Sequence, residues 1–274
     1  MESQPPEAAP RPLTFLAAAL WTLLVALLYG VLVSIVAAAH AGAFVDIVTR
    51  ATCKLLAYSV VLFAILRLHE RDSSIRHVLA VRRPPAILVF LGAAVGAGLS
   101  PGTMWLDGVL ARRYPTSAED LEVYERIFDT PTVGKKIALL LAIVVVMPIC
   151  DELFFRGALF TPLKRGRRAE SVILATAAYD TLLGGSSPRE LASILATALA
   201  ISWIRAVSGS VFPSVAARVT FFAVQVVPLV VGHDPQYAWT VGLAGVGVAA
   251  LSLAGIAAVG KRSTLALEAR LEDG

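Results

Sequence analysis

The sequence predicts an all-α fold, a polytopic transmembrane helical bundle of about eight spans in one domain. Of its 274 residues 57% are hydrophobic and 16% are charged, and the mean hydropathy is +0.74. A soluble domain carries roughly a quarter charged residues, so these values exclude a disordered chain, a disulfide-rich secreted scaffold and an ordinary soluble enzyme. Cys53 and Cys150 lie far apart in apolar segments, which favours neither a disulfide framework nor a cysteine zinc site.

The spans are predicted from uncharged runs, because a membrane-crossing helix needs about 20 apolar residues. Eight segments meet or approach this length, of which the fifth is short: 13–39, 44–67, 85–106, 136–156, 171–184, 190–206, 209–231 and 238–260. We expect 13–260 to form one domain, between a Pro-rich disordered cytosolic tail at 1–12 and a second cytosolic tail at 261–274. The triplet Ala39-His40-Ala41 resembles a signal-peptidase site, but the preceding apolar run is about twice the usual length, so we expect an uncleaved anchor.

Basic residues in the loops predict the orientation, because they accumulate on the cytoplasmic side. One side, with both termini and the loops after the second, fourth and sixth spans, holds Arg11, Arg71, Arg76, Arg82, Arg83, Lys164, Arg165, Arg167, Arg168, Arg205, Lys261, Arg262 and Arg270. The other side holds only Arg112, Arg113, Arg126, Lys135, Lys136 and Arg189. We therefore expect a cell inner membrane protein with both termini cytoplasmic, and the net charge of +4 does not indicate nucleic-acid binding.

The longest outer loop contains the start of a helix. Thr116 and Ser117 can cap it, and the acids that follow suit the positive end of the helix dipole. Leu121, Tyr124 and Phe128 then fall on one face. This pattern predicts a short amphipathic helix, which either lies on the membrane surface or packs on neighbouring loops.

Small residues in two spans predict close helix packing. Gly92 and Gly96 are spaced four apart in the third span, and the last span is rich in Gly and Ala. This feature indicates a packed bundle and no particular function.

Ionisable groups inside a span are costly and by default indicate function. Asp151 and Glu152 are adjacent, and Arg156 follows Glu152 by four residues on the same helix face. Pro148 lacks an amide hydrogen and should distort the helix just before the acids. Two interpretations stay open: a carboxylate site restrained by Arg156, or a helix-end ion pair in which Arg156 extends to the interface.

Asp180 and Arg218 each lie nine residues from the cytoplasmic end of a span, about 14 Å deep at 1.5 Å per residue. The acidic pair sits at a comparable depth. We therefore predict a buried network in which Arg218 faces Asp151, Glu152 or Asp180; alternatively, Asp180 and Arg218 face water.

A further polar group lies on the second span. Asp46, Arg50 and Lys54 are spaced by four, which predicts a stripe of ion pairs within that helix. We place this stripe toward the outer half, away from the other charges, and give it no catalytic role.

The motif Asp151-Glu152-Leu153-Phe154-Phe155-Arg156-Gly157 resembles the E-E-x-x-x-R motif of the CPBP family of intramembrane proteases, which comprises CAAX proteases and bacteriocin-processing or self-immunity proteins. The preceding Met147-Pro148 and the stretch Gly209-Ser210-Val211-Phe212-Pro213-Ser214 are also similar to the family. The resemblance covers roughly residues 136–225.

The second and third family motifs are degenerate. Both contain a histidine, yet no histidine lies between residues 78 and 232; the chain has His40, His69, His77 and His233. Arg218 stands at the position of the last motif histidine, and Phe222 follows where the family has Asn. Tyr179 and Asp180 lie near the second motif.

The resemblance implies that Glu152 would activate water, with Asp151, Arg156 and Arg218 as further candidate catalytic residues. Asp180, Tyr179 and Cys150 are candidates for substrate binding or for the charge network. Zinc needs about three protein ligands, and carboxylates with Cys150 form a poor zinc set. The guanidinium of Arg218 could instead neutralise the carboxylates. We expect no cofactor, and zinc or another divalent metal only if the family mechanism is retained.

Three functions follow from these features. The leading hypothesis is a pseudoprotease that binds membrane-anchored peptides or partner proteins in the lipid bilayer. The second is an active endopeptidase that processes C-terminal or lipid-anchored segments, with Glu152 as base and Arg218 stabilising the oxyanion; Cys150 as nucleophile is disfavoured by its apolar, acidic surroundings. The third is a small transporter, although no internal repeat supports it.

Overall fold

The computed structural model is a helical bundle. It describes residues 13–40, 46–71, 73–128, 132–185, 187–233 and 238–272, without the side chains of Asp120 and of residues 261–272. Within these ranges every regular element is a helix, which confirms the predicted fold class. The predicted tail at 1–12 lies outside the described residues.

Seven helical runs in the described part of the chain are long and apolar enough to cross a membrane. They are α1 (Phe15–Ala39), α2 (Ile47–His69), α4 (Ala86–Ala111), a composite run (Val133–Lys164), α10 (Pro188–Ser208), α11 (Phe212–Val230) and the Trp239–Gly260 part of α12 (Trp239–Glu272). The predicted fifth segment forms α9 (Ala169–Gly184), which has only 16 residues. The remaining helices are the short α3 (Ile75–Val78) and α5 (Ala118–Phe128).

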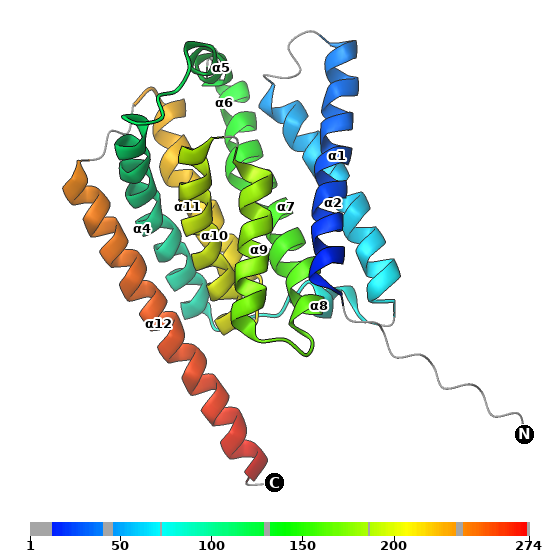
Figure 1. The fold of residues 1–274 in the computed structure, drawn as a ribbon. Helices are drawn as coiled ribbons and strands as arrows, with labels where there is room; N and C mark the ends of the chain where they lie inside the picture. Colours follow the sequence, from blue (N-terminus) through cyan, green and yellow to red (C-terminus); the bar gives the residue numbers. More distant parts are fainter. Residues whose placement is uncertain are drawn as a thin grey trace, which may run out of the picture.

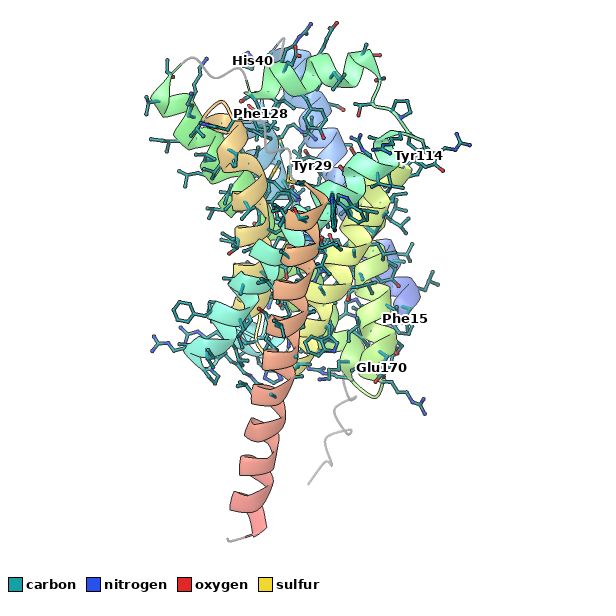
Figure 2. All side chains as sticks on the ribbon, turned by 90° about the vertical axis from the view of Figure 1, so that its left-hand side faces the viewer. Phe15, Tyr29, His40, Tyr114, Phe128 and Glu170 are labelled. Carbon is teal, nitrogen blue, oxygen red and sulfur yellow. The ribbon has the colours of Figure 1, made fainter. Side chains whose placement is uncertain are left out.

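Successive long helices run in opposite directions, so that α1 begins and α12 ends toward the same end of the bundle (Figure 1). Phe15 and Glu170 lie at this end, whereas His40, Tyr114 and Phe128 lie at the other (Figure 2). We call them the Phe15 end and the His40 end. The predicted helix after Thr116 is present as α5, across the His40 end. At the Phe15 end α12 continues as a helix to Glu272, through most of the predicted C-terminal tail.

Glycines bring α4 and α11 into backbone contact. A Cβ on Gly96 would lie 1.9 Å from the carbonyl oxygen of Ala217, and one on Gly92 would lie 2.3 Å from that of Pro213. The predicted close packing of the third span is therefore confirmed. Because Ala217 lies in this contact, the seam fixes the position of its neighbour Arg218.

The fourth span is longer than predicted. It was expected to end at residue 156, but it continues to Lys164 as α6 (Val133–Leu140), η1 (Leu141–Val146), α7 (Met147–Glu152), η2 (Leu153–Leu159) and α8 (Phe160–Lys164). The continuation is stabilised by Ala158, Leu159, Phe160 and Leu163, all fully buried. The distortion expected at Pro148 takes the form of π-helical turns before and after α7.

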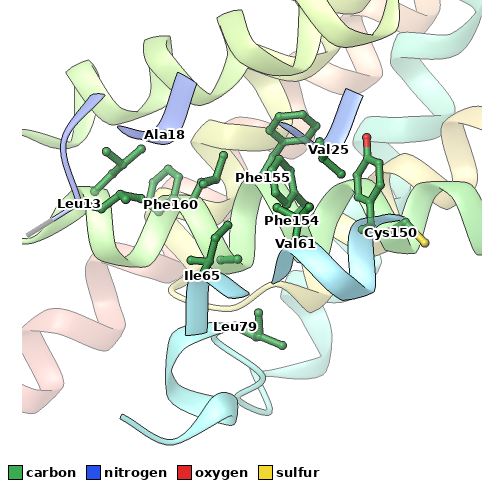
Figure 3. Packing of buried hydrophobic residues seen from close by; sticks show 14 of the residues in the cluster. Leu13, Ala18, Val25, Val61, Ile65, Leu79, Cys150, Phe154, Phe155 and Phe160 are labelled. Atoms are coloured by element: carbon green, nitrogen blue, oxygen red, sulfur yellow. The ribbon is translucent and has the colours of Figure 1, made fainter. Parts of the chain in front are cut away.

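A hydrophobic cluster with an aromatic centre directly follows the acidic pair along the chain (Figure 3). Phe154 and Phe155 are fully buried, with ring centroids 5.0 Å apart, and Tyr58 of α2 packs edge-on against Phe154 at 5.3 Å. Residues from α1 and α2, including Ala18, Val25 and Val61 among others, complete the cluster. The composite run is thus held against the first two helices at the level of the acids.

Candidate functional site

Three carboxylates and three cationic side chains form one connected group, which we call the charge layer. Its members come from α2, α7, η2, α9 and α11, and their formal charges cancel. They are Lys54, Asp151, Glu152, Arg156, Asp180 and Arg218. Their side chains are between 0% and 17% exposed, so the layer is a nearly dry ion-pair network.

Arg218 contacts all three carboxylates. Its Nη2 lies 2.5 Å from Asp180 Oδ2, its Nε 3.2 Å from Glu152 Oε1, and its Nη1 3.3 Å from Asp151 Oδ2. The predicted network is therefore present. The alternative in which Asp180 and Arg218 face water is wrong, because these residues are only 4% and 5% exposed.

Arg156 joins the acidic pair to α9 and α10. Its Nη1 lies 2.5 Å from Asp180 Oδ2 and 3.4 Å from Glu152 Oε1, and its Nη2 donates to the carbonyl of Ala198 at 3.0 Å. The side chain is fully buried. The alternative in which Arg156 extends to the membrane interface is therefore wrong.

Lys54 is the member of the layer that sequence reasoning missed. Its Nζ lies 2.7 Å from Asp151 Oδ1 and 5.2 Å from the ring centroid of Tyr58, whose hydroxyl also faces Asp151. The predicted stripe within the second span is wrong, since Asp46 caps the start of α2 and Arg50 donates to the Tyr29 hydroxyl at 3.2 Å. The sequence feature that could have revealed this role is the position of Lys54 inside an apolar span, where an unpaired charge is costly.

Two predicted site residues lie beside the layer with other contacts. The hydroxyl of Tyr179 donates to the carbonyl of Phe15 at 2.8 Å, which ties α9 to α1. Cys150 is 5% exposed and belongs to the hydrophobic cluster around Phe154. The geometry thus brings together Asp151, Glu152, Arg156, Asp180 and Arg218, and leaves Tyr179 and Cys150 at the margin.

Glu152 is the least satisfied member of the layer. Among the described residues neither of its carboxylate oxygens has a hydrogen-bond partner, although Oε1 lies within ion-pair distance of two guanidinium groups. A buried polar atom without a partner is costly, so native proteins keep few of them. Glu152 is therefore the member of the layer whose burial is least compensated by hydrogen bonds.

A fourth buried cation supports the helix that carries Arg156. Arg205 was predicted as a loop charge, but it is 5% exposed within α10. Its Nε donates to the carbonyl of Arg156 at 2.9 Å, its Nη2 donates to Thr161 Oγ1 at 3.0 Å, and its guanidinium stacks over Phe160. These contacts tie α10 to η2 and to α8.

The donor set of the layer does not fit a divalent metal. Each carboxylate already has a guanidinium or ammonium nitrogen within 3.4 Å, and such cations repel a metal ion. Over the described ranges no group of three or more His, Cys, Asp or Glu side chains is arranged to hold one.

The fold and the site define a polytopic membrane protein whose bundle encloses a charge-neutral acid–base layer. Residues 133–224, about a third of the chain, match the family model Rce1-like, described as type II CAAX prenyl endopeptidase Rce1-like. The match includes every member of the layer except Lys54, and it confirms the family resemblance predicted from the motif around Asp151. No match to the chain was found among curated proteins or among solved structures.

Proposed function

We propose that this chain is an Rce1-like membrane protein that binds membrane-anchored peptides or partner proteins and performs no metal-dependent cleavage. The observation that carries the proposal is the internal neutralisation of all three carboxylates by Lys54, Arg156 and Arg218. A protease of this family would use such carboxylates to activate a water molecule. In this chain, cationic side chains surround the carboxylates instead. We therefore assign the ion pairs to stabilisation of the bundle, and we propose recognition of a membrane-anchored segment as the function of the protein.

The orientation proposed with this function follows from charge. Exposed arginines gather at the Phe15 end, among them Arg71, Arg76, Arg82 and Arg83. On the basis of the positive-inside rule we propose that this end faces the cytoplasm, and we propose the cell inner membrane as the location of the bundle.

The test uses the full chain in lipid nanodiscs and a farnesylated peptide that ends in a CAAX sequence. We expect the fluorescently labelled peptide to bind, measured by anisotropy, and to stay intact by mass spectrometry, with or without EDTA or added zinc. The same peptide without the farnesyl group is the matched control. Failure of the farnesylated peptide to bind, or zinc-dependent cleavage, would contradict the proposal.

A second function, an active endopeptidase, is favoured by the unpartnered oxygens of Glu152. In this case Glu152 takes a proton from water as the hydroxide attacks the scissile carbonyl, and Arg218 stabilises the oxyanion. Glu152 then returns the proton to the leaving amine as the C–N bond breaks. Cleavage would then resist EDTA and be lost in Glu152→Gln. A cleavage product that forms equally in wild type and Glu152→Gln would exclude this mechanism.

A further inference from the structure

The connection from the end of α2 to the start of α4 carries a dense group of arginines. We call residues 67–83 the basic connector. It contains Arg67, Arg71, Arg76, Arg82 and Arg83, and all five are exposed. Arg82 contacts the ring of His77 at 2.8 Å, and the other four make no ion pair or side-chain hydrogen bond with any residue that the structure describes.

Other arginines at the same end are used inside the protein. Arg165 pairs at 2.7 Å with Glu70, the buried acid of the connector. Arg167 donates to the carbonyls of Leu13 and Leu163 at 2.7 and 3.0 Å. Arg165 and Arg167 therefore stabilise the fold, whereas the arginines of the basic connector present their charge to the outside.

The connector lies where a membrane surface would meet the bundle. It joins the ends of two spans, and its exposed apolar side chains stand beside the arginines: Leu68 is 71% exposed and Ile75 is 57% exposed. Apolar side chains next to guanidinium groups suit the boundary between acyl chains and headgroups.

The middle of the connector is fixed to the bundle. The carbonyl of Ala80 accepts from Val211 N at 3.2 Å, and the carbonyl of Arg82 accepts from Ser210 Oγ at 2.7 Å. Ala80 has a φ of 50°, a conformation that a residue with a Cβ rarely adopts, so this turn is held by its surroundings. The arginines are thus displayed from a fixed scaffold.

From these observations we propose that the basic connector binds the headgroups of anionic phospholipids. Several exposed arginines directly beside spanning helices match the charge of such a surface. The connector also packs on η2, because a Cβ on Gly157 would lie 3.0 Å from Leu79 Cδ2. Headgroup binding would therefore stabilise the end of the bundle next to Arg156.

The experiment measures lipid selection by the full chain reconstituted in dioleoylphosphatidylcholine vesicles. Trace spin-labelled phosphatidylglycerol or phosphatidylcholine reports the immobilised lipid fraction, which gives a relative association constant. We expect wild type to prefer phosphatidylglycerol. Each arginine that contacts a headgroup should raise the relative association constant about fivefold. The variant R76Q/R82Q/R83Q should lose this preference, whereas R112Q/R113Q, with two exposed arginines near the His40 end, should retain it.

A control at high salt uses wild type alone, so its result does not depend on whether the variants fold. At about 1 M NaCl the Debye length falls to about 3 Å, so wild type should lose its preference for phosphatidylglycerol. Equal association of both lipids with wild type would overturn the proposal and leave an acidic protein segment as the occupant. Persistence of the preference in R76Q/R82Q/R83Q, or its equal loss in R112Q/R113Q, would also overturn it.

Discussion

Two sets of ion pairs in this molecule have similar chemistry but different surroundings. In the charge layer, Arg156 and Glu152 are fully buried, and the shortest contacts are 2.5 Å. Outside the layer, Arg126 and Glu122 pair at 3.6 Å with side chains 70% and 68% exposed, and Arg189 lies 3.7 Å from Asp107. Water can replace a lost partner in the second setting but not in the first. A charge in the layer therefore depends on its neighbours for solvation.

The largest effect is expected for Arg218→Met, because this change leaves three buried carboxylates with only Lys54 and Arg156. Loss of one partner from a buried ion pair costs about 3–5 kcal/mol in the free energy of unfolding. Thermal and denaturant unfolding in detergent would measure it. Arg218→Lys keeps the charge and should lose less. If Arg218→Met unfolds like wild type, the layer contributes no stability and the contrast between the two settings fails.

The seam that positions Arg218 should be nearly as sensitive. In Gly96→Ala the new Cβ meets the backbone oxygen of Ala217 at 1.9 Å, so α4 and α11 must separate. Overpacking of this kind costs about 1–3 kcal/mol in unfolding free energy. Gly30→Ala is the matched control, since nothing lies within 4 Å of its Cβ, and it should unfold at or above the wild-type temperature. Equal melting of both variants would show that the seam does not hold α11.

A smaller loss is expected for Lys54→Met at the accessible edge of the layer. The side chains of Lys54 and Asp151 are 17% and 13% exposed, and Asp151 keeps its contact with Arg218. We expect a loss of about 1.5 kcal/mol in the free energy of unfolding. In a double-mutant cycle with Asp151→Asn the two losses should not add. Strict additivity would mean that the contact contributes nothing.

The smallest effect belongs to the exposed pair on α5. Glu122→Gln should change the free energy of unfolding by about 0.5 kcal/mol or less, because an exposed ion pair contributes little. Chemical denaturation beside wild type would measure the difference. A loss as large as that of Lys54→Met would indicate that α5 is buried against another partner.

The parts of this structure that sequence could predict are those set by one helix at a time. Apolar runs predicted the spans, and similar depths on three helices predicted that Arg218 faces Asp151, Glu152 or Asp180, all of which it contacts. The role of Lys54 and the burial of Arg205 both depend on the length of the fourth span, since Arg205 contacts Phe160 and Thr161 beyond its predicted end. The fourth span was ended at Arg156, although buried apolar residues continue it to Lys164, so Asp151 lies deeper than predicted and within reach of Lys54. Pairing between tilted helices depends on such lengths, which composition alone does not fix.

Glu152→Gln is the most direct measurement, because it changes one charge and almost no volume at the most buried acid. If the layer is structural, the variant leaves two cations sharing fewer carboxylates, and wild type should exceed it by about 3–5 kcal/mol in unfolding free energy. Thermal unfolding of both proteins in the same detergent gives the comparison. Active-site groups are often held at a cost to stability, so a variant that melts at or above wild type would contradict a structural layer and indicate that Glu152 is kept for chemistry.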